Sequence, residues 1–269
     1  METESTFKIF EILAILGALA WLPQLIVFIN KKITIPKLTI ITDKDLEIGY
    51  TTLGPIFNLQ IAFLAEKKRA LIRKVEIEMT HENNETHKFT WDWFEEILYE
   101  VSIPQSGLIP TRKNQKAIAI NVNPDSLVEK KIGFQQNAFK EKQNRLVQLT
   151  TEEFLNIINA GNDSNIIRTR NTFNNLRDYY KNGFNWKIGK YNAKINAILS
   201  GNQIFTTNVD FQLTNRDIKT LERNIEIAQN LVDIEYGADI KVKQNWLWVN
   251  TKKLLPTKSK PNILSQKNM

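Results

Sequence analysis

Residues 74–91 read KVEIEMTHENNETHKFTW, and this stretch decides the fold class of the chain. On both sides of the polar segment 82–85, apolar and polar residues alternate with a period of two. Two such runs joined by turn-forming residues are typical of a β-hairpin with one buried face. If the turn is centred on Asn84, Met79 faces Phe89 across the two strands. The stretch therefore predicts antiparallel β-structure.

The same register places the only two histidines of the chain, His81 and His87, opposite each other near Glu82 and Glu85. Two imidazoles about 5 Å apart could share a metal ion. A catalytic zinc normally takes three protein ligands in firm geometry, which a hairpin tip supplies poorly. The alternative is two half-exposed histidines that finish a strand pair. His81 and His87 are the candidate metal ligands, and no cofactor is predicted.

A second hairpin is expected further along the chain. Alternating runs in residues 191–199 and 205–213 flank a turn, and three residues, Gly201–Gln203, are the natural loop. Just before it, residues 186–193 read WKIGKYNA, which resembles the G-x-Y-x-C stretch opening strand F of immunoglobulin-like sandwiches, with Ala193 in place of the cysteine. The resemblance implies that Tyr191 is the corner tyrosine, its hydroxyl bonded back to the preceding turn.

The expected fold is thus mostly β with α: an immunoglobulin-like antiparallel β-sandwich over residues 33–249 with a helical insertion around 92–183. Within the insertion, Arg145–Leu149 looks extended, and a capping-box pattern predicts a helix from Thr150 to Gly161. A second helix is predicted over residues 165–182, and a third starts after Asn215. The cations of the second helix suit a surface helix better than a nucleic-acid site.

One segment reads as membrane-spanning. Residues Ile9 to Ile29, IFEILAILGALAWLPQLIVFI, would form a helix about 30 Å long, enough to cross a bilayer once. A cleaved signal peptide and a buried soluble helix are the alternatives; Glu11 within the apolar run opposes the first. Ala14 and Ala18 would permit close approach of a second copy, so a homodimer through this helix is an open alternative.

Cations flank this helix unevenly. Lys31, Lys32 and Lys37 follow it, whereas only Lys8 precedes it. The positive-inside rule therefore predicts a single-pass protein of the cell membrane with residues 1–8 outside and the C-terminal domain in the cytoplasm.

Composition narrows the function classes. The chain has no cysteine, which excludes disulfides, thiolate nucleophiles and thiolate metal sites. Its net charge of +7 is concentrated in the C-terminal residues 250–269, which read as a basic disordered tail. Nucleic acid is therefore an improbable partner, and the lipid bilayer and a protein are the expected ones.

No glycine-rich phosphate loop, nucleophile elbow or zinc-protease motif occurs in the sequence. We therefore expect a non-catalytic protein-interaction or scaffold module held at the membrane. The first alternative is an exported or surface-facing adhesion or envelope protein. The second is a membrane-tethered hydrolase with a site in the insertion, where Asp92, Glu95 and Glu96 form an acidic group.

Overall fold

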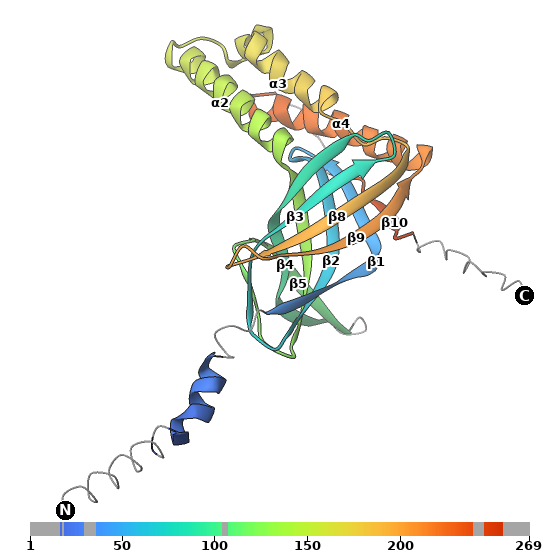
Figure 1. Ribbon diagram of the computed structural model, residues 1–269. Coiled ribbons are helices and arrows are strands. Elements are labelled where there is room, and N and C mark those ends of the chain that lie inside the picture. Colours follow the sequence, from blue (N-terminus) through green and yellow to red (C-terminus); the bar gives the residue numbers. More distant parts are fainter. Residues whose placement is uncertain (1–16, 18, 30–35, 104–106, 239–244, 255–269) are drawn as a thin grey trace, which may run out of the picture.

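The computed structural model describes residues 17, 19–29, 36–103, 107–238 and 245–254, with backbone only for 97–112. As predicted, they are mostly antiparallel β-structure with helices (Figure 1). The elements in chain order are β1 Lys37–Thr51, β2 Gly54–Glu66, β3 Ala70–His81, β4 Thr86–Ile103, β5 Gly107–Lys116, β6 Ile120–Val122, β7 Leu127–Gln136, α2 Asn137–Asn159, a 3₁₀ helix Ser164–Thr169, α3 Asn171–Asn182, β8 Gly189–Leu199, β9 Ile204–Leu213, α4 Asn215–Glu235 and β10 Val249–Lys252.

The named strands form one sheet in the order β10-β1-β2-β7-β4-β3-β8-β9, with β5 beside β4 and β6 beside β3. The two ends of this order meet, because the Thr251 hydroxyl donates to the carbonyl of Gln212 (3.0 Å) and the Leu254 N–H to that of Asp210 (2.6 Å). The sheet is therefore curled and barrel-like (Figure 1), where the sequence predicts two separate packed sheets. Long strands with bulges bend enough to bring both ends of one sheet together.

The curled sheet encloses an apolar core. Phe57 stacks on Phe211 with ring centroids 5.7 Å apart and also contacts Phe134, and all three side chains are fully buried. The residues that alternate with these core residues along the same strands point to the outer face of the sheet. Alternation along β1, β2, β7 and β4 thus separates an apolar interior from a polar outer surface.

The predicted register of the first hairpin is wrong by two residues. Met79 pairs with His87, and Ile77 pairs with Phe89. The His81 N–H donates to the carbonyl of Glu85, which leaves a three-residue loop, 82–84, ended by Asn84 at φ 69°. Asparagine tolerates this left-handed conformation, so the turn is centred one residue earlier than predicted. A shift of two residues keeps every side chain on its face.

The second hairpin also has a three-residue loop, as predicted. Its residues are Ser200–Asn202 instead of Gly201–Gln203, because the Leu199 N–H donates to the carbonyl of Gln203. Asn202 takes the left-handed position at φ 59°, the role that Asn84 has in the first hairpin. In both hairpins the last residue of the loop is therefore an asparagine in the left-handed conformation.

The helical insertion is shorter than predicted. The described residues between 92 and 136 form strands β4–β7 and the connections between them, so the helical part begins only at Asn137. The helix predicted from Thr150 begins 13 residues earlier, and Arg145–Leu149 is helical instead of extended. The reason is the 3.6-residue spacing of Phe139, Thr150 and Ile157, which face a buried layer. The predicted ends at Gly161 and residue 182 fit the observed helix termini, but the second predicted helix is divided into the 3₁₀ helix Ser164–Thr169 and α3.

Helices α2, α3 and α4 gather at one end of the curled sheet (Figure 1). They bury a second apolar cluster, in which Phe139 stacks on Tyr179 at 4.7 Å and meets Tyr50 edge-on at 6.0 Å. The hydroxyl of Tyr50 donates to the carbonyl of Tyr180, and burial raises the pKa of Tyr50 well above its usual range. This tyrosine of β1 therefore ties the helical layer to the sheet.

The predicted membrane span lies only partly within the described chain. Residues 9–16 and 18 fall outside it, and 19–29 are helical. Among the residues with described structure, no helix combines the length and apolar character needed to cross a bilayer. Residues 1–8 and the tail from 255 onward also lie outside the described part, whereas residues 250–252 of the predicted tail belong to strand β10.

Candidate binding site

A row of outward-facing residues crosses five neighbouring strands. Strand pairing sets them side by side in the order Asn250, Glu47, Asn58, Gly133 and Trp93, from β10 through β1, β2 and β7 to β4. Residues from distant parts of the sequence thereby share one line on the outer face. We call the surface along this line the outer groove, lined by Glu47, Asn58, Trp93, Glu95, Asn114, Lys131, Gly133 and Trp248.

Two bulges shape this surface. In β4 the register shifts between Trp91 and Trp93, so that Trp91 points inward and Trp93 outward although their spacing would put both on one face. In β1 the register shifts between Thr42 and Leu46, and the extra residues carry Asp43 and Asp45 to a hollow beside the groove. Bulges commonly re-aim side chains next to binding sites.

Both tryptophans of the groove lie against a glycine. A Cβ atom built on Gly133 would come within 1.9 Å of the Trp93 ring, and one built on Gly49 within 2.2 Å of the Trp248 ring. Only glycine permits such close approach of an indole to a strand backbone. Trp93 and Trp248 are both half-buried, so each ring has one face on the sheet and keeps part of its surface exposed in the groove.

The charged groups of the groove converge on one lysine. Lys131 Nζ lies 3.4 Å from Glu47 Oε2 and 3.3 Å from Glu95 Oε2. The carboxylates come from β1 and β4, and Lys131 stands between them on β7, directly opposite Glu95. The three side chains are 37%, 28% and 19% exposed for Lys131, Glu47 and Glu95, so water screens the pairs only in part.

Asn58 is the most unusual polar residue of the site. It is only 8% exposed, and its Nδ2 donates to Glu47 Oε2 at 2.8 Å. Its Oδ1 is buried and has no hydrogen-bond partner among the described residues. A buried carbonyl oxygen without a donor costs roughly 1–3 kcal/mol, so such a group in a native structure calls for an explanation.

The groove has a volume of about 230 Å³, and the adjoining hollow that contains Asp43 and Asp45 has about 190 Å³. The two share Glu47, Asn58 and Lys131. Together they offer two aromatic faces, several acceptors and the Lys131 and Asn114 donors in one place. This combination suits a small polar ligand with one apolar face.

The histidines predicted as metal ligands lie elsewhere, at the tip of the first hairpin. His81 Nε2 donates to the carbonyl of Ile188 (3.0 Å), and its Nδ1 accepts from the Asn83 N–H (3.3 Å). His87 Nδ1 accepts from Gln136 Nε2 at 2.8 Å, and its Nε2 donates to Glu85 Oε1 at 3.1 Å. All four ring nitrogens are thus occupied. Within the described ranges, no group of three or more His, Asp or Glu side chains could hold a metal ion.

The structure separates the predicted acidic group. Asp92 pairs with Lys140 at 2.7 Å, and Glu96 pairs with Lys130 at 2.8 Å. Of these three acidic residues, Glu95 alone is part of the lining of the outer groove.

Tyr191 lies in the core beside the first hairpin. Its hydroxyl donates to the carbonyl of Lys187 (3.1 Å) and accepts from the N–H of the same residue (2.7 Å). Burial raises the pKa of Tyr191 to about 12, so the hydroxyl keeps its proton at neutral pH. These two bonds hold the backbone of Lys187, just before β8, against Tyr191 of that strand. Its identity as the corner tyrosine of an immunoglobulin-like domain stays a prediction.

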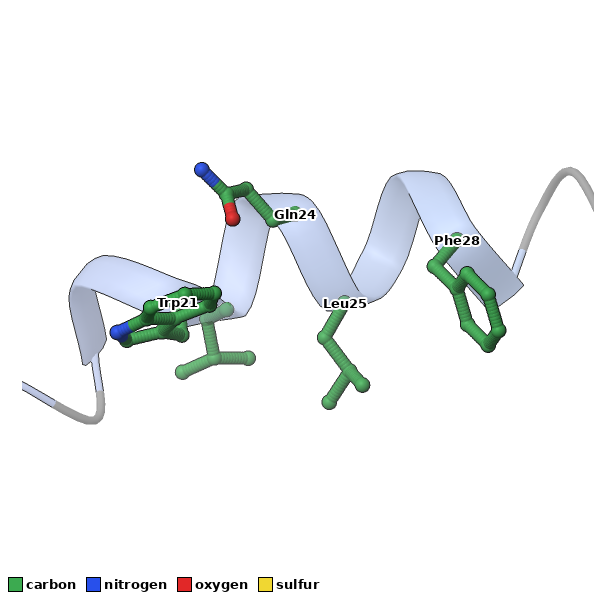
Figure 2. Close-up of a pocket in the computed structure, with 5 residues that line it drawn as sticks. Trp21, Gln24, Leu25 and Phe28 are labelled. Atoms are coloured by element: carbon green, nitrogen blue, oxygen red, sulfur yellow. The ribbon is translucent and has the colours of Figure 1, made fainter.

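A larger hollow of about 440 Å³ lies on the described part of the predicted span. Figure 2 shows Trp21, Leu25 and Phe28 along one side of this single helix, with Gln24 on another. The hollow is only the space between side chains of one helix, so we assign no ligand site to it.

Sequence reasoning missed most of the groove. Glu47, Asn58, Lys131 and Trp248 have ordinary neighbours in the sequence, and only strand pairing brings them together. One local feature could have pointed to the site: the run Trp91-Asp92-Trp93-Phe94 breaks the period of two, which is how a bulge looks in sequence.

Comparisons with known proteins identify no family. No family model matches the chain, and no curated protein sequence matches it. Among solved structures, a family 123 glycoside hydrolase from Clostridium perfringens shows 11% identity and a TM-score of 0.33. That match covers 68% of this chain and 28% of the hydrolase chain, so this chain spans under a third of its length. A likeness at this level supports no argument about function.

Proposed function

We propose that the chain is a single-pass membrane protein whose globular domain binds a partner, without catalysis, through the outer groove. Residues 9–29 anchor it in the cell membrane, and the cations Lys31, Lys32 and Lys37 keep the domain in the cytoplasm. The anchor supplies location, and the groove supplies recognition.

The observation that carries this proposal is the unpaired Oδ1 of Asn58. Four buried side-chain atoms lack a hydrogen-bond partner among the described residues, and Asn58 Oδ1 is the one that belongs to the groove lined by two tryptophans. A ligand donor would satisfy this oxygen once the side chains over it move aside, because the atom itself has almost no accessible surface in the free protein. The free protein would then lose some stability at the unpaired Asn58 oxygen, and binding of the partner would restore it.

Binding fits the charges of the groove better than hydrolysis does. A hydrolase needs a carboxyl group available to give or take a proton at the reacting atom. Glu47 and Glu95 instead lie within ion-pair distance of the same Lys131 Nζ. The lysine holds both carboxylates in place as acceptors.

The proposal predicts an unusual effect of Asn58→Leu on stability. The substitution removes an unsatisfied oxygen and one bond to Glu47, so we expect the free energy of unfolding to stay within about 1 kcal/mol of wild type. Urea unfolding of the full chain in detergent, followed by tryptophan fluorescence, measures this difference.

Asn224→Leu is the matched control. Asn224 is also a buried asparagine, but its Nδ2 donates to the carbonyl of Leu247 (2.7 Å) and its Oδ1 accepts from the Leu247 N–H (2.9 Å). Leaving both backbone groups unpaired should cost about 2–4 kcal/mol. If Asn58→Leu destabilises as much as Asn224→Leu, Asn58 is structural and the proposal loses its support.

Location is tested separately, using the absence of native cysteine. Lys88→Cys places a thiol on an exposed strand residue with ordinary backbone, unlike Asn84, whose φ of 69° would strain a cysteine. Intact cells and lysed cells are then treated with a membrane-impermeant maleimide. We expect labelling only after lysis. Labelling of intact cells would place the domain outside and favour the adhesion or envelope alternative.

A further inference from the structure

We infer that the outer groove binds a neutral sugar ring, such as one hexopyranose unit of a glycan. This inference rests on the proposed function, because it names the class of ligand that the groove takes. It is carried by three features of the described residues: the two indole rings, the balance of donors and acceptors, and the net charge.

The indole rings supply flat apolar platforms. Trp93 lies against Gly133 and Trp248 against Gly49, so each ring is supported by strand backbone from below. The C–H face of a pyranose ring is flat and apolar, and it stacks on such a surface while its hydroxyls point sideways. Support by the backbone reduces the ordering entropy that a ligand must offset.

The polar groups match hydroxyls, which both donate and accept. Asn58 Oδ1 lacks a donor, and the carboxylates of Glu47 and Glu95 line the groove as acceptors. Lys131 and Asn114 can donate to sugar oxygens. A ligand with donors alone or acceptors alone would leave part of this set unpaired.

The charge of the groove selects a neutral ligand. Its lining carries the two carboxylates of Glu47 and Glu95 and the ammonium of Lys131, and the adjoining hollow adds Asp43 and Asp45. The excess of carboxylates repels phosphates and other anions. A cation must approach Lys131 Nζ, which already stands within 3.4 Å of both groove carboxylates. An uncharged hydroxylated ring avoids both penalties.

The test is titration calorimetry of the full chain with four neutral trisaccharides: maltotriose, cellotriose, mannotriose and tri-N-acetylchitotriose. A polyoxyethylene detergent keeps the protein in solution, because alkyl glycoside detergents would themselves offer a sugar. We expect at least one trisaccharide to bind saturably, with affinity at least tenfold lower in both Trp93→Ala and Trp248→Ala. Glu76→Gln, on the exposed face of β3 and outside the groove, should leave the affinity unchanged.

Three results would overturn the inference. The first is no binding of any trisaccharide, and the second is binding that neither tryptophan variant weakens although both unfold like wild type. The third is saturable binding of tetramethylammonium or a lysine-rich peptide in place of sugars. The stability test separates these failures from that of the proposed function: if Asn58→Leu is neutral and no sugar binds, the groove remains a site and only its ligand class is wrong.

Discussion

Phe139→Ala should lower the free energy of unfolding by about 3–5 kcal/mol. Phe139 lies in the first turn of helix α2, is 2% exposed, and lies between the rings of Tyr50 and Tyr179. Its ring also fills the space left by Gly54 and Gly183, each of which would clash with it if it carried a Cβ. Truncation opens a cavity at the junction of sheet and helices, which rigid backbone on both sides cannot close.

Leu155→Ala is the control for this prediction. It changes a leucine of the same helix that is 51% exposed, so we expect a loss under about 0.5 kcal/mol. Chemical denaturation of the full chain measures both variants. Equal small effects of the two substitutions would show that the helical layer does not pack on the sheet through Phe139.

Gly133→Ala should move Trp93 off the sheet and weaken ligand binding by about 5- to 150-fold. The added Cβ would lie 1.9 Å from the indole, and the ring is the part that can move because it lies at the surface. Loss of one stacking platform is worth about 1–3 kcal/mol, and 1.4 kcal/mol is tenfold in affinity. Calorimetry with the best-binding trisaccharide measures the loss, and tryptophan emission reports the displaced ring.

Gly201→Ala is the matched control, since a Cβ at this hairpin position meets nothing within 4 Å. It should change neither emission nor affinity. If Gly133→Ala keeps wild-type affinity, Trp93 is not a platform for the ligand.

The sequence alone predicts the secondary structure of the sheet well where the period of two is unbroken. The hairpin faces are confirmed: Met79 and Phe89 are buried in the core, as their alternation predicts. Their register could not be predicted, because it depends on whether Asn84 adopts a left-handed conformation. The helix end at Gly161 was predictable from the same kind of argument, because Gly161 adopts a left-handed conformation at φ 72°.

The groove could not be predicted from the sequence. Glu47, Asn58 and Lys131 become neighbours only through strand order, and no local pattern shows that β7 lies between β2 and β4. The outward turn of Trp93 depends on a bulge that breaks the alternation on which the prediction relied. Period-based reasoning is thus least informative at the positions that form the candidate site.

The most direct test of the groove is fluorine NMR of the full chain labelled with 5-fluorotryptophan and titrated with the trisaccharides. The chain has six tryptophans, so substitution of each one assigns its signal. We expect the signals of Trp93 and Trp248 to shift together and saturably, while those of Trp21, Trp91 and Trp186 stay in place. Shifts confined to tryptophans outside the groove, or no shift at any concentration that saturates calorimetric binding, would contradict the assignment of this surface as the binding site.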